Sequence, residues 1–451
     1  MAKDKLTDYS ATNGSNTDVG GINIDEGMLP SAVNNALREI LTHLKNFASG
    51  TDGIDVLSLA DDDASAAMKL QAPASVTSDT TLTLPDGDGA DGQALITDGS
   101  GTLAWAYPYG NRNLLINGSA SVNQRGDATG VTATAYKGPD RFQTTAVSAG
   151  TWSISQSSTA PTGFSNSIKF DCTTANASLG ATSELGIGQI IEAQDLQHLN
   201  YGASGAQSLT LSFWVRSNKT GTYAIWFYEY DGARQRGANY TISSADTWEH
   251  KTVTIEGDTS GTINDDNGQG LLVRWILAAG SNYTSGTAAS AWEAYTAANS
   301  FVGQSVNLAD STSNEWYITG VQLEVGEQAT PFEHRSFADE LARCERYFWK
   351  TYNYSVAPGS VSTASHLLGS PDADQNYFTL AVPHVQMRSS PTRVIYNPST
   401  GTVSQMRADS TNHTASISGT DVHGGGAIFA QNSLIGKSNF VKAHLTMDAE
   451  L

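Results

Sequence analysis

Two neighbouring segments, residues 209–216 and 223–230, carry the side chains best suited to binding a ligand. Both alternate in the manner of β-strands, whose successive side chains point to opposite faces. One face is apolar and should be core, and the opposite face carries Trp214, Arg216, Trp226, Tyr228 and Tyr230. Aromatic rings with polar edges suit sugars, because a ring stacks on the apolar face of a sugar while polar neighbours bond its hydroxyls. We predict a glycan-binding face here; the alternatives are that both sheets of a sandwich are packed, or that this face contacts a sister chain.

Covalent catalysis has no support in the sequence. There is no G-x-S-x-G turn for a nucleophilic serine, and Cys344 lies among charged residues of an expected helix. A glycan-cleaving enzyme stays open as an alternative, because hydrolysis needs only two carboxylates at a set separation and the chain has 45 acidic residues. The parallel β-helix typical of depolymerising spikes would appear as short repeated rungs, and the sequence has no such repeat. We therefore predict that the protein is not an enzyme.

Candidate metal ligands are scattered along the chain. Two acidic turns, at residues 86–91 and 264–267, offer oxygen ligands for calcium, but neither has the spacing of the twelve-residue calcium loop. Such turns also form for conformational reasons alone. The nine histidines make no HxH or HExxH pair; one per chain could still meet its copies on a threefold axis, and the candidates are His413, His423 and His444. We predict no metal and no other cofactor.

The composition excludes several classes of partner. The 451 residues carry a net charge of −20 and no basic run, which excludes nucleic acid as a main partner. The sequence has no stretch of about 18 apolar residues, so we predict no membrane insertion. No apolar core follows the charged N-terminal residues, so we expect no signal peptide. We expect a protein made and folded in a cytoplasm, with Cys172 and Cys344 as reduced, buried thiols.

The elements that must position the ligand face are mainly β. Only 16% of the residues are charged, while Thr, Ser, Gly and aromatic residues are abundant, which favours many short strands joined by turns. Four parts are expected: an N-terminal arm with a short helix at 1–50, a β shaft or linker at 51–108, an antiparallel jelly-roll sandwich at 109–335, and a short helix with a C-terminal β tip domain at 336–451.

The expected sandwich rests on a run of strand-like segments without helices between them. The clearest lie at residues 151–156, 166–173, 189–193, 208–217, 222–230, 248–255, 270–278 and 315–325. A hairpin is expected where residues 93–97 and 102–106 flank a Gly-rich turn. Ser336 is expected to cap the helix that opens the last part.

Residues 31–48 predict a helix, with Pro30 and Ser31 as the start signal and Ser31 as the N-cap. The apolar positions follow a spacing of four and three residues, which is typical of a seam between parallel helices. We predict that the seam brings sister chains together through Val33, Leu37, Ile40, Leu44 and Phe47.

Four groups of residues together resemble phage tail-fibre proteins of the marine podovirus and siphovirus kind. Residues 15–27 with the following 34–40 look like the virion-proximal start of such fibres, and residues 70–74, 81–85 and 92–105 are similar to their shaft segments. Residues 113–118 and 316–326 look like the first and last strands of a jelly roll related to carbohydrate-binding modules. Residues 331–348 are similar to a segment that precedes the C-terminal β domain of many fibres.

The resemblance implies a homotrimer with two sister chains, held in the virion through the N-terminus by a phage tail or adaptor protein. The distal part would then adsorb to the host through a surface glycan or an outer-membrane receptor. One departure is that Thr319 and Gly320 stand where such modules often carry an acidic residue, which argues against an inherited sugar or calcium site. Besides a glycan-depolymerising tail spike, a purely structural virion fibre, on tail or head, remains an alternative.

Overall fold

The structure is a computed structural model. It describes residues 8–10, 15–25, 27–48, 56–60, 67–71, 81–89, 93–97, 101–106, 111–369, 377–380, 386–408, 410–418, 426–430 and 441–451. The chain divides into two compact units, Met1–Leu82 and Thr83–Leu451. No helix within the described ranges is both long enough and apolar enough to cross a membrane.

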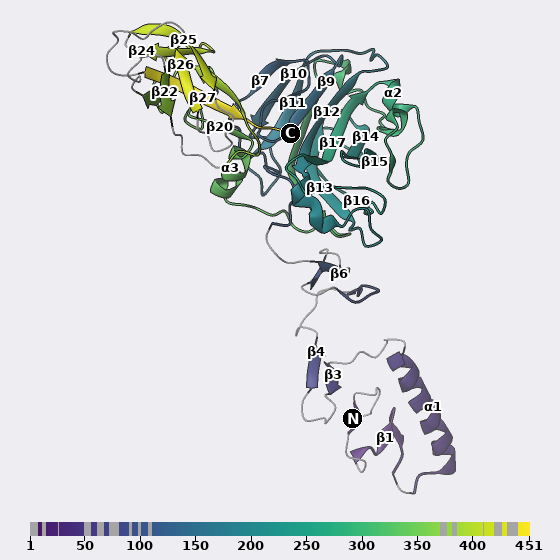
Figure 1. Cartoon of the computed structure of the whole chain (residues 1–451). Helices are drawn as coiled ribbons and strands as arrows, with labels where there is room; N and C mark the ends of the chain where they lie inside the picture. Colours follow the sequence, from purple (N-terminus) through teal and green to yellow (C-terminus); the bar gives the residue numbers. More distant parts are fainter. Residues whose placement is uncertain are drawn as a thin grey trace. The chain divides into compact units, whose positions relative to one another are not determined.

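The described residues of the first unit form one helix and two small hairpins (Figure 1). Strands β1 (Asp18–Val19) and β2 (Ile22–Asn23) pair with each other, as do β3 (Val56–Ala60) and β4 (Ala67–Gln71). Helix α1 spans Pro30–Ala48, which confirms the predicted helix. It begins at Pro30, whose fixed φ suits the first helical position, so Ser31 lies within the first turn and its prediction as the N-cap is wrong.

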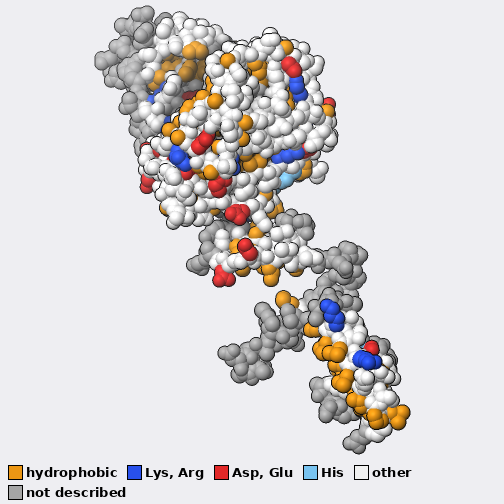
Figure 2. Space-filling view, turned by 90° about the vertical axis from the view of Figure 1, so that its right-hand side faces the viewer, with side chains coloured by type: hydrophobic (Ala, Val, Ile, Leu, Met, Phe, Trp, Pro, Cys, Tyr) orange, Lys and Arg blue, Asp and Glu red, His pale blue; other side chains and the backbone are white. Residues whose placement is uncertain are grey.

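Helix α1 has one covered side and one open side. Ala36 and His43 are buried, and the hydroxyl of Tyr9 lies 3.0 Å from Nδ1 of His43. Of the predicted seam residues, Ile40 is half-buried and the other four are exposed. With Leu41, which is 65% exposed, these four form an apolar stripe that a single chain leaves open; its residues are Val33, Leu37, Leu41, Leu44 and Phe47. Figure 2 shows apolar side chains gathered along this unit.

The second unit begins with the hairpin expected from the sequence. Strand β5 (Ala94–Thr97) pairs antiparallel with β6 (Leu103–Ala106). The indole N–H of Trp105 donates to the carbonyl oxygen of Gly87 at 2.8 Å, which ties the hairpin to the preceding loop. Whether this region forms a shaft stays a prediction.

Two antiparallel sheets then pack face to face as a sandwich, as predicted (Figure 1). The six-stranded sheet has the order β16 (Glu249–Ile255), β13 (Leu209–Ser217), β19 (Glu315–Val325), β11 (Ser167–Thr174), β10 (Thr151–Ser157) and β7 (Ala128–Val131). The seven-stranded sheet has the order β18 (Glu293–Ala294), β15 (Arg234–Ile242), β14 (Gly221–Glu229), β17 (Gln269–Ala279), β12 (Glu184–Glu192), β9 (Gln143–Val147) and β8 (Ala135–Tyr136).

All eight strand segments expected in the sandwich are strands, most of them shifted by a residue or two at their ends. Strand β12 begins five residues earlier than expected, because Gly186 and Gly188 interrupt the apolar pattern there. Strand β15 was missed, since its sequence (Arg234–Ile242) is polar and carries neither alternation nor a run of β-branched residues.

The core between the sheets is aromatic. Phe213 packs edge-on against Trp275 at 5.5 Å between ring centroids, and Phe170 packs edge-on against Trp316 at 6.0 Å. Edge-to-face pairs of this kind add about 0.5–1.5 kcal/mol beyond burial of their area. Cys172 is buried and unpaired, and Cys344 of the C-terminal region is likewise buried and unpaired, in agreement with the expectation of two thiols.

The C-terminal region opens with α3 (Phe337–Glu345), capped by Ser336, whose hydroxyl accepts the N–H of Asp339 at 3.2 Å. An antiparallel sheet follows, in the order β20 (Phe348–Lys350), β27 (Val441–Asp448), β24 (Gln405–Ala408), β25 (Thr411–Ser418), β26 (Gly426–Ala430) and β22 (Tyr377–Leu380). Strands β21 (Leu367–Gly369) and β23 (Thr392–Tyr396) also pair with β27. Buried Met387, Met406 and Met447 lie in its core. Its place at the tip of a fibre stays a prediction.

Candidate functional site

The structure settles which faces of β13 and β14 are core. Phe213 and Val215 of β13 and Ile225 and Phe227 of β14 are fully buried between the sheets. The alternate positions point outward, as the sequence predicts. The candidate ligand residues therefore do lie on outer faces of the sandwich.

The prediction that all five candidates share one face is wrong. Strand β13 belongs to the six-stranded sheet and β14 to the seven-stranded sheet. Since both sheets turn their inner faces to the same core, their outer faces lie on opposite sides of the sandwich. Trp214 and Arg216 are thus separated from Trp226, Tyr228 and Tyr230. The segment at 218–220 crosses between sheets instead of closing a hairpin within one.

Four rings form an aromatic platform on the outer face of the seven-stranded sheet: Trp226, Tyr228, Tyr230 and Tyr295. Trp226 and Tyr228 stack at 5.0 Å, and Tyr228 meets Tyr230 at 4.9 Å and Tyr295 at 5.5 Å. Trp226 is 8% exposed, whereas Tyr295 is 45% exposed. Burial raises the pKa of both Tyr228 and Tyr230, so their phenols stay protonated and can donate hydrogen bonds.

The position of Trp226 in the platform is fixed from two sides. Its indole N–H donates to Oε1 of Gln235 at 3.1 Å. Gln235 is itself held, because its amide nitrogen donates to Glu293 at 3.0 Å and to the carbonyl oxygen of Thr296 at 2.9 Å. Phe301 is buried and meets Trp226 edge-on at 5.6 Å. Trp226, held in this way, gives a fixed support to Tyr228, which stacks on it.

A polar strip lies beside the platform. Arg274 of β17 is paired in register with Trp226, and its guanidinium carbon lies 5.7 Å from the indole ring. The same guanidinium reaches Glu184 at 2.8 Å and Gln143 at 3.3 Å. A side chain at Gly188 would lie 2.6 Å from the carbonyl oxygen of Val273. Glycine therefore leaves this part of the face without a protruding side chain. Rings next to fixed donors and acceptors are the groups that a sugar requires.

Sequence reasoning missed Tyr295 and the polar strip. Arg274 had a signal, since it is the one charged residue in an otherwise apolar strand, β17. The sequence gives no signal for Tyr295, because this residue follows a two-residue strand in a region without periodicity.

The outer face of the six-stranded sheet carries a second group of rings. Trp214 lies 5.1 Å from the ring of His250, and Arg216 lies 5.1 Å from the ring of Tyr317. Arg216 also pairs with Asp246 at 3.1 Å. Burial lowers the pKa of His250, so this ring is largely neutral at pH 7. Trp248 meets Tyr317 edge-on at 6.2 Å, so the four rings on this face form two separate pairs instead of one adjoining group.

The weaker metal candidates are not brought together. Among the residues that the structure describes, no three His, Cys, Asp or Glu side chains are grouped so that they could hold a metal ion. His444 is buried with Nδ1 at 3.0 Å from the hydroxyl of Thr351 and Nε2 at 2.9 Å from the carbonyl oxygen of Ser362. Both ring nitrogens are therefore engaged within the chain. His423 lies outside the described residues.

Known proteins give only distant comparisons. No protein-family description matches the sequence, and no curated protein matches it. Among solved structures, the enzymatically active domain of tailspike protein 4 from bacteriophage CBA120 is similar over 48% of this chain and 22% of that chain, with 11% identity and a TM-score of 0.25.

Two carbohydrate-binding modules are similar at the same level. The family 11 module from Clostridium thermocellum, in complex with a mixed-linked tetrasaccharide, matches 46% of this chain and 98% of that chain, with 11% identity and a TM-score of 0.23. TmCBM61, in complex with β-1,4-galactotriose, matches 48% and 100%, with 12% identity and a TM-score of 0.23. Similarity this low indicates neither a shared ligand nor a shared activity.

Proposed function

We propose that this chain forms a homotrimeric fibre of a phage virion and attaches the virion to a host-surface glycan through the aromatic platform. The observation that carries the proposal is the platform itself: four adjoining rings, one of them fixed by Gln235 and Phe301, beside the polar strip of Arg274. Rings of this kind on a soluble protein mark a binding surface.

The platform is favoured over the outer face of the six-stranded sheet for two reasons. Its rings adjoin one another, so they can stack on successive sugars of a chain. Its most exposed ring, Tyr295, is not enclosed by the protein. The face of Trp214 and Arg216 stays a candidate.

The trimer is supported by the apolar stripe of α1, which a single chain leaves open. Its spacing of four and three residues suits two sister helices in parallel. Three platforms on one fibre would multiply weak single-site contacts into firm adsorption. The N-terminal arm would dock to a phage tail or adaptor protein, and the fibre would bind its glycan without cleaving it.

The proposal is tested by removing exposed rings and measuring glycan binding on an immobilised glycan panel. A double Tyr228→Ala, Tyr295→Ala variant should weaken binding by about tenfold or more, since each stacked ring contributes roughly 0.5–1.5 kcal/mol. Trp226 is left intact, because it is largely buried and its removal would disturb the sheet.

Trp214→Ala is the matched control, since it removes a ring from the opposite outer face and should leave binding unchanged. If the control binds glycan more weakly and the double variant binds normally, the glycan site lies on the outer face of the six-stranded sheet and not on the platform. Release of new reducing ends from a bound polysaccharide would show an enzyme instead. Binding to no glycan at all would favour a purely structural fibre.

A further inference from the structure

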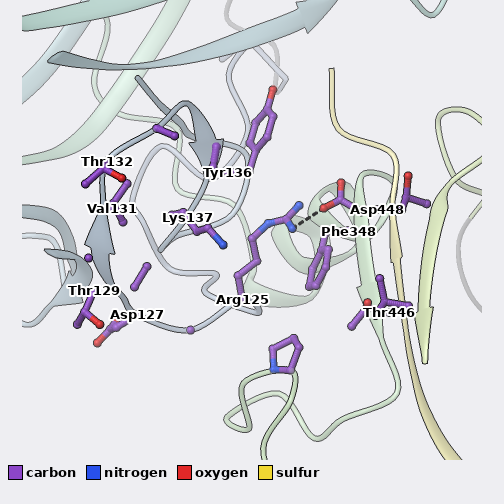
Figure 3. Close-up of a pocket in the computed structure, with 18 of the residues that line it drawn as sticks. Arg125, Asp127, Thr129, Val131, Thr132, Tyr136, Lys137, Phe348, Thr446 and Asp448 are labelled. Carbon is purple, nitrogen blue, oxygen red and sulfur yellow. Dashed lines mark hydrogen bonds and ion pairs between the residues drawn. The ribbon is translucent and has the colours of Figure 1, made fainter. Parts of the chain in front are cut away.

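A cleft of about 830 Å³ lies between the sandwich and the C-terminal sheet (Figure 3). Strands β7 and β8, each at the end of its sheet, supply one wall, and β23 and β27 supply the other. The volume falls within the roughly 300–1,000 Å³ of small-molecule sites. None of the four aromatic platform residues lines it, so the cleft is a separate place on the molecule.

The centre of the cleft is rigid and electrically balanced. The guanidinium of Arg125 stacks on the ring of Phe348 at 3.8 Å. It pairs with Asp448 at 2.7 Å and with Glu450 at 3.1 Å. Two carboxylates therefore neutralise Arg125, and the side chain is not available to hold a further anion.

Lys137 is the cation in the cleft that has no counter-ion. Its side chain is exposed and points into the cavity in Figure 3, on the same side as Arg125. Within the part of the chain that the structure describes, it makes no ion pair and no side-chain hydrogen bond. An exposed ammonium without an ion pair attracts an anionic group locally, although the net charge of −20 on the chain acts against anions at longer range.

The acidic residue nearest in sequence does not balance it. Asp127 also lines the cleft, but its Oδ1 accepts from the side-chain amide of Asn123 at 3.0 Å and from the backbone N–H of Gln156 at 2.9 Å. The carboxylate thus links the loop that precedes β7 to strand β10. In Figure 3 it lies on the β7 side, apart from the ammonium of Lys137.

The rest of the lining suits a polyhydroxylated ligand. Hydroxyl groups come from both walls, from Thr129 and Thr132 on one and Thr392 and Thr446 on the other. The ring of Tyr136 is held in place, because its hydroxyl donates to the carbonyl oxygen of Leu451 at 2.9 Å. Aromatic rings and hydroxyls around one unpaired cation describe a site for a sugar that carries a negative charge.

We propose that this cleft binds a uronate residue of the host glycan, with its carboxylate on Lys137 and its hydroxyls against the threonine side chains. The inference rests on the proposed function in taking a glycan as the ligand. It adds a second subsite, formed jointly by the sandwich and the C-terminal sheet, and it specifies an acidic sugar.

The test is calorimetric titration of the full chain with tetrasaccharides of mannuronate, galacturonate and glucuronate, each beside its neutral hexose counterpart. At least one uronate should bind more tightly than its neutral counterpart, and added salt should weaken that binding. Lys137→Gln should reduce uronate affinity about tenfold, the usual order for a hydrogen bond to a charged group. Lys442→Gln, which removes an exposed lysine outside the cleft, should change nothing.

Each outcome separates this inference from the proposed function. If the platform variant loses glycan binding while Lys137→Gln binds uronates like the unaltered chain, the cleft site is overturned and the proposed function stands. If no uronate binds better than its neutral counterpart, the acidic specificity is overturned. If Lys137→Gln loses uronate binding while the platform variant loses none, the cleft is supported and the platform is not the main glycan site.

Discussion

At the residue scale, one carboxyl group of the sandwich is held in an unfavourable setting. Glu229 at the end of β14 is fully buried, and its Oε2 has no hydrogen-bond partner among the described residues. A side chain at Gly261 would lie 2.1 Å from that oxygen, so any larger residue there would force the Glu229 carboxylate to move. Burial raises the pKa of Glu229 to about 7, and the nearby charge of buried Asp258 adds to the effect.

This setting predicts a pH-dependent stability that Glu229→Gln should remove. Because the folded pKa of about 7 exceeds the ordinary value of 4.5, the folded state holds the proton more tightly. The group's contribution to stability is therefore present below about pH 4.5 and is lost as pH rises toward 7. Glutamine does not titrate, so the unfolding free energy of the variant relative to the unaltered chain should rise across this window. Denaturant unfolding at several pH values measures it.

The control for this prediction is Glu327→Gln, which changes an exposed carboxyl group in the same unit. The difference for Glu229→Gln should vary with pH more than the difference for this control does. A difference for Glu229→Gln that does not vary between pH 4.5 and 7 would contradict the raised pKa.

At the element scale, α1 is an amphipathic helix with more apolar surface than its own unit covers. The buried side, at Ala36 and His43, faces the N-terminal segments, and the apolar stripe remains exposed. Two heptads are too few for a stable helix pair by themselves, so any association must be reinforced by other contacts between chains. In the proposed trimer, the stripe would contribute to assembly without being sufficient for it.

We expect Leu37→Glu combined with Leu44→Glu to dissociate the proposed trimer, because like charges would face one another along the predicted seam. Native mass spectrometry should show three chain masses for the unaltered protein and one for the variant. Thr42→Glu adds a charge on the exposed polar side of α1 and should leave the mass unchanged. A monomeric unaltered protein would refute the trimer, and a trimeric double variant would place the assembly contacts elsewhere.

At the scale of the whole molecule, buried charges join the sandwich to the C-terminal sheet. Arg141 is 1% exposed, pairs with Glu450, and lies 3.4 Å from the ring of Tyr347. Arg346 pairs with buried Glu192 at 2.7 Å. These contacts tie the two β parts into one compact unit.

Glu450→Ala should therefore destabilise the second unit strongly. It leaves Arg141 as a buried charge without its partner, and losses of about 3–5 kcal/mol are usual for such a change. Asp246→Ala is the contrast, because it removes the partner of Arg216 at an exposed site and should cost less than about 1 kcal/mol. Urea unfolding followed by tryptophan fluorescence compares the two variants, and equal small losses would show that the buried pair contributes little.

Much of the local structure could be predicted from the sequence. The helix at Pro30–Ala48, the cap at Ser336 and all eight expected sandwich strands are present, because capping residues, heptad spacing and alternation are properties of neighbouring residues. Strand β15 was not predicted, because its largely polar sequence shows no alternation of apolar and polar residues. The buried faces of β13 and β14 were also predicted correctly, because an apolar side of a strand must find a core.

What only the tertiary structure decided is which outward faces belong together. Alternation tells that Trp214 and Trp226 both point away from the core, but the hydrogen-bonding partners of β13 and β14 place them in different sheets. The platform needs Tyr295 from a distant loop, and the cleft needs Lys137 beside residues about 300 positions later. Contacts between residues so far apart in the sequence depend on which strands pair with each other. A local pattern of side chains carries no information about the partner of a strand.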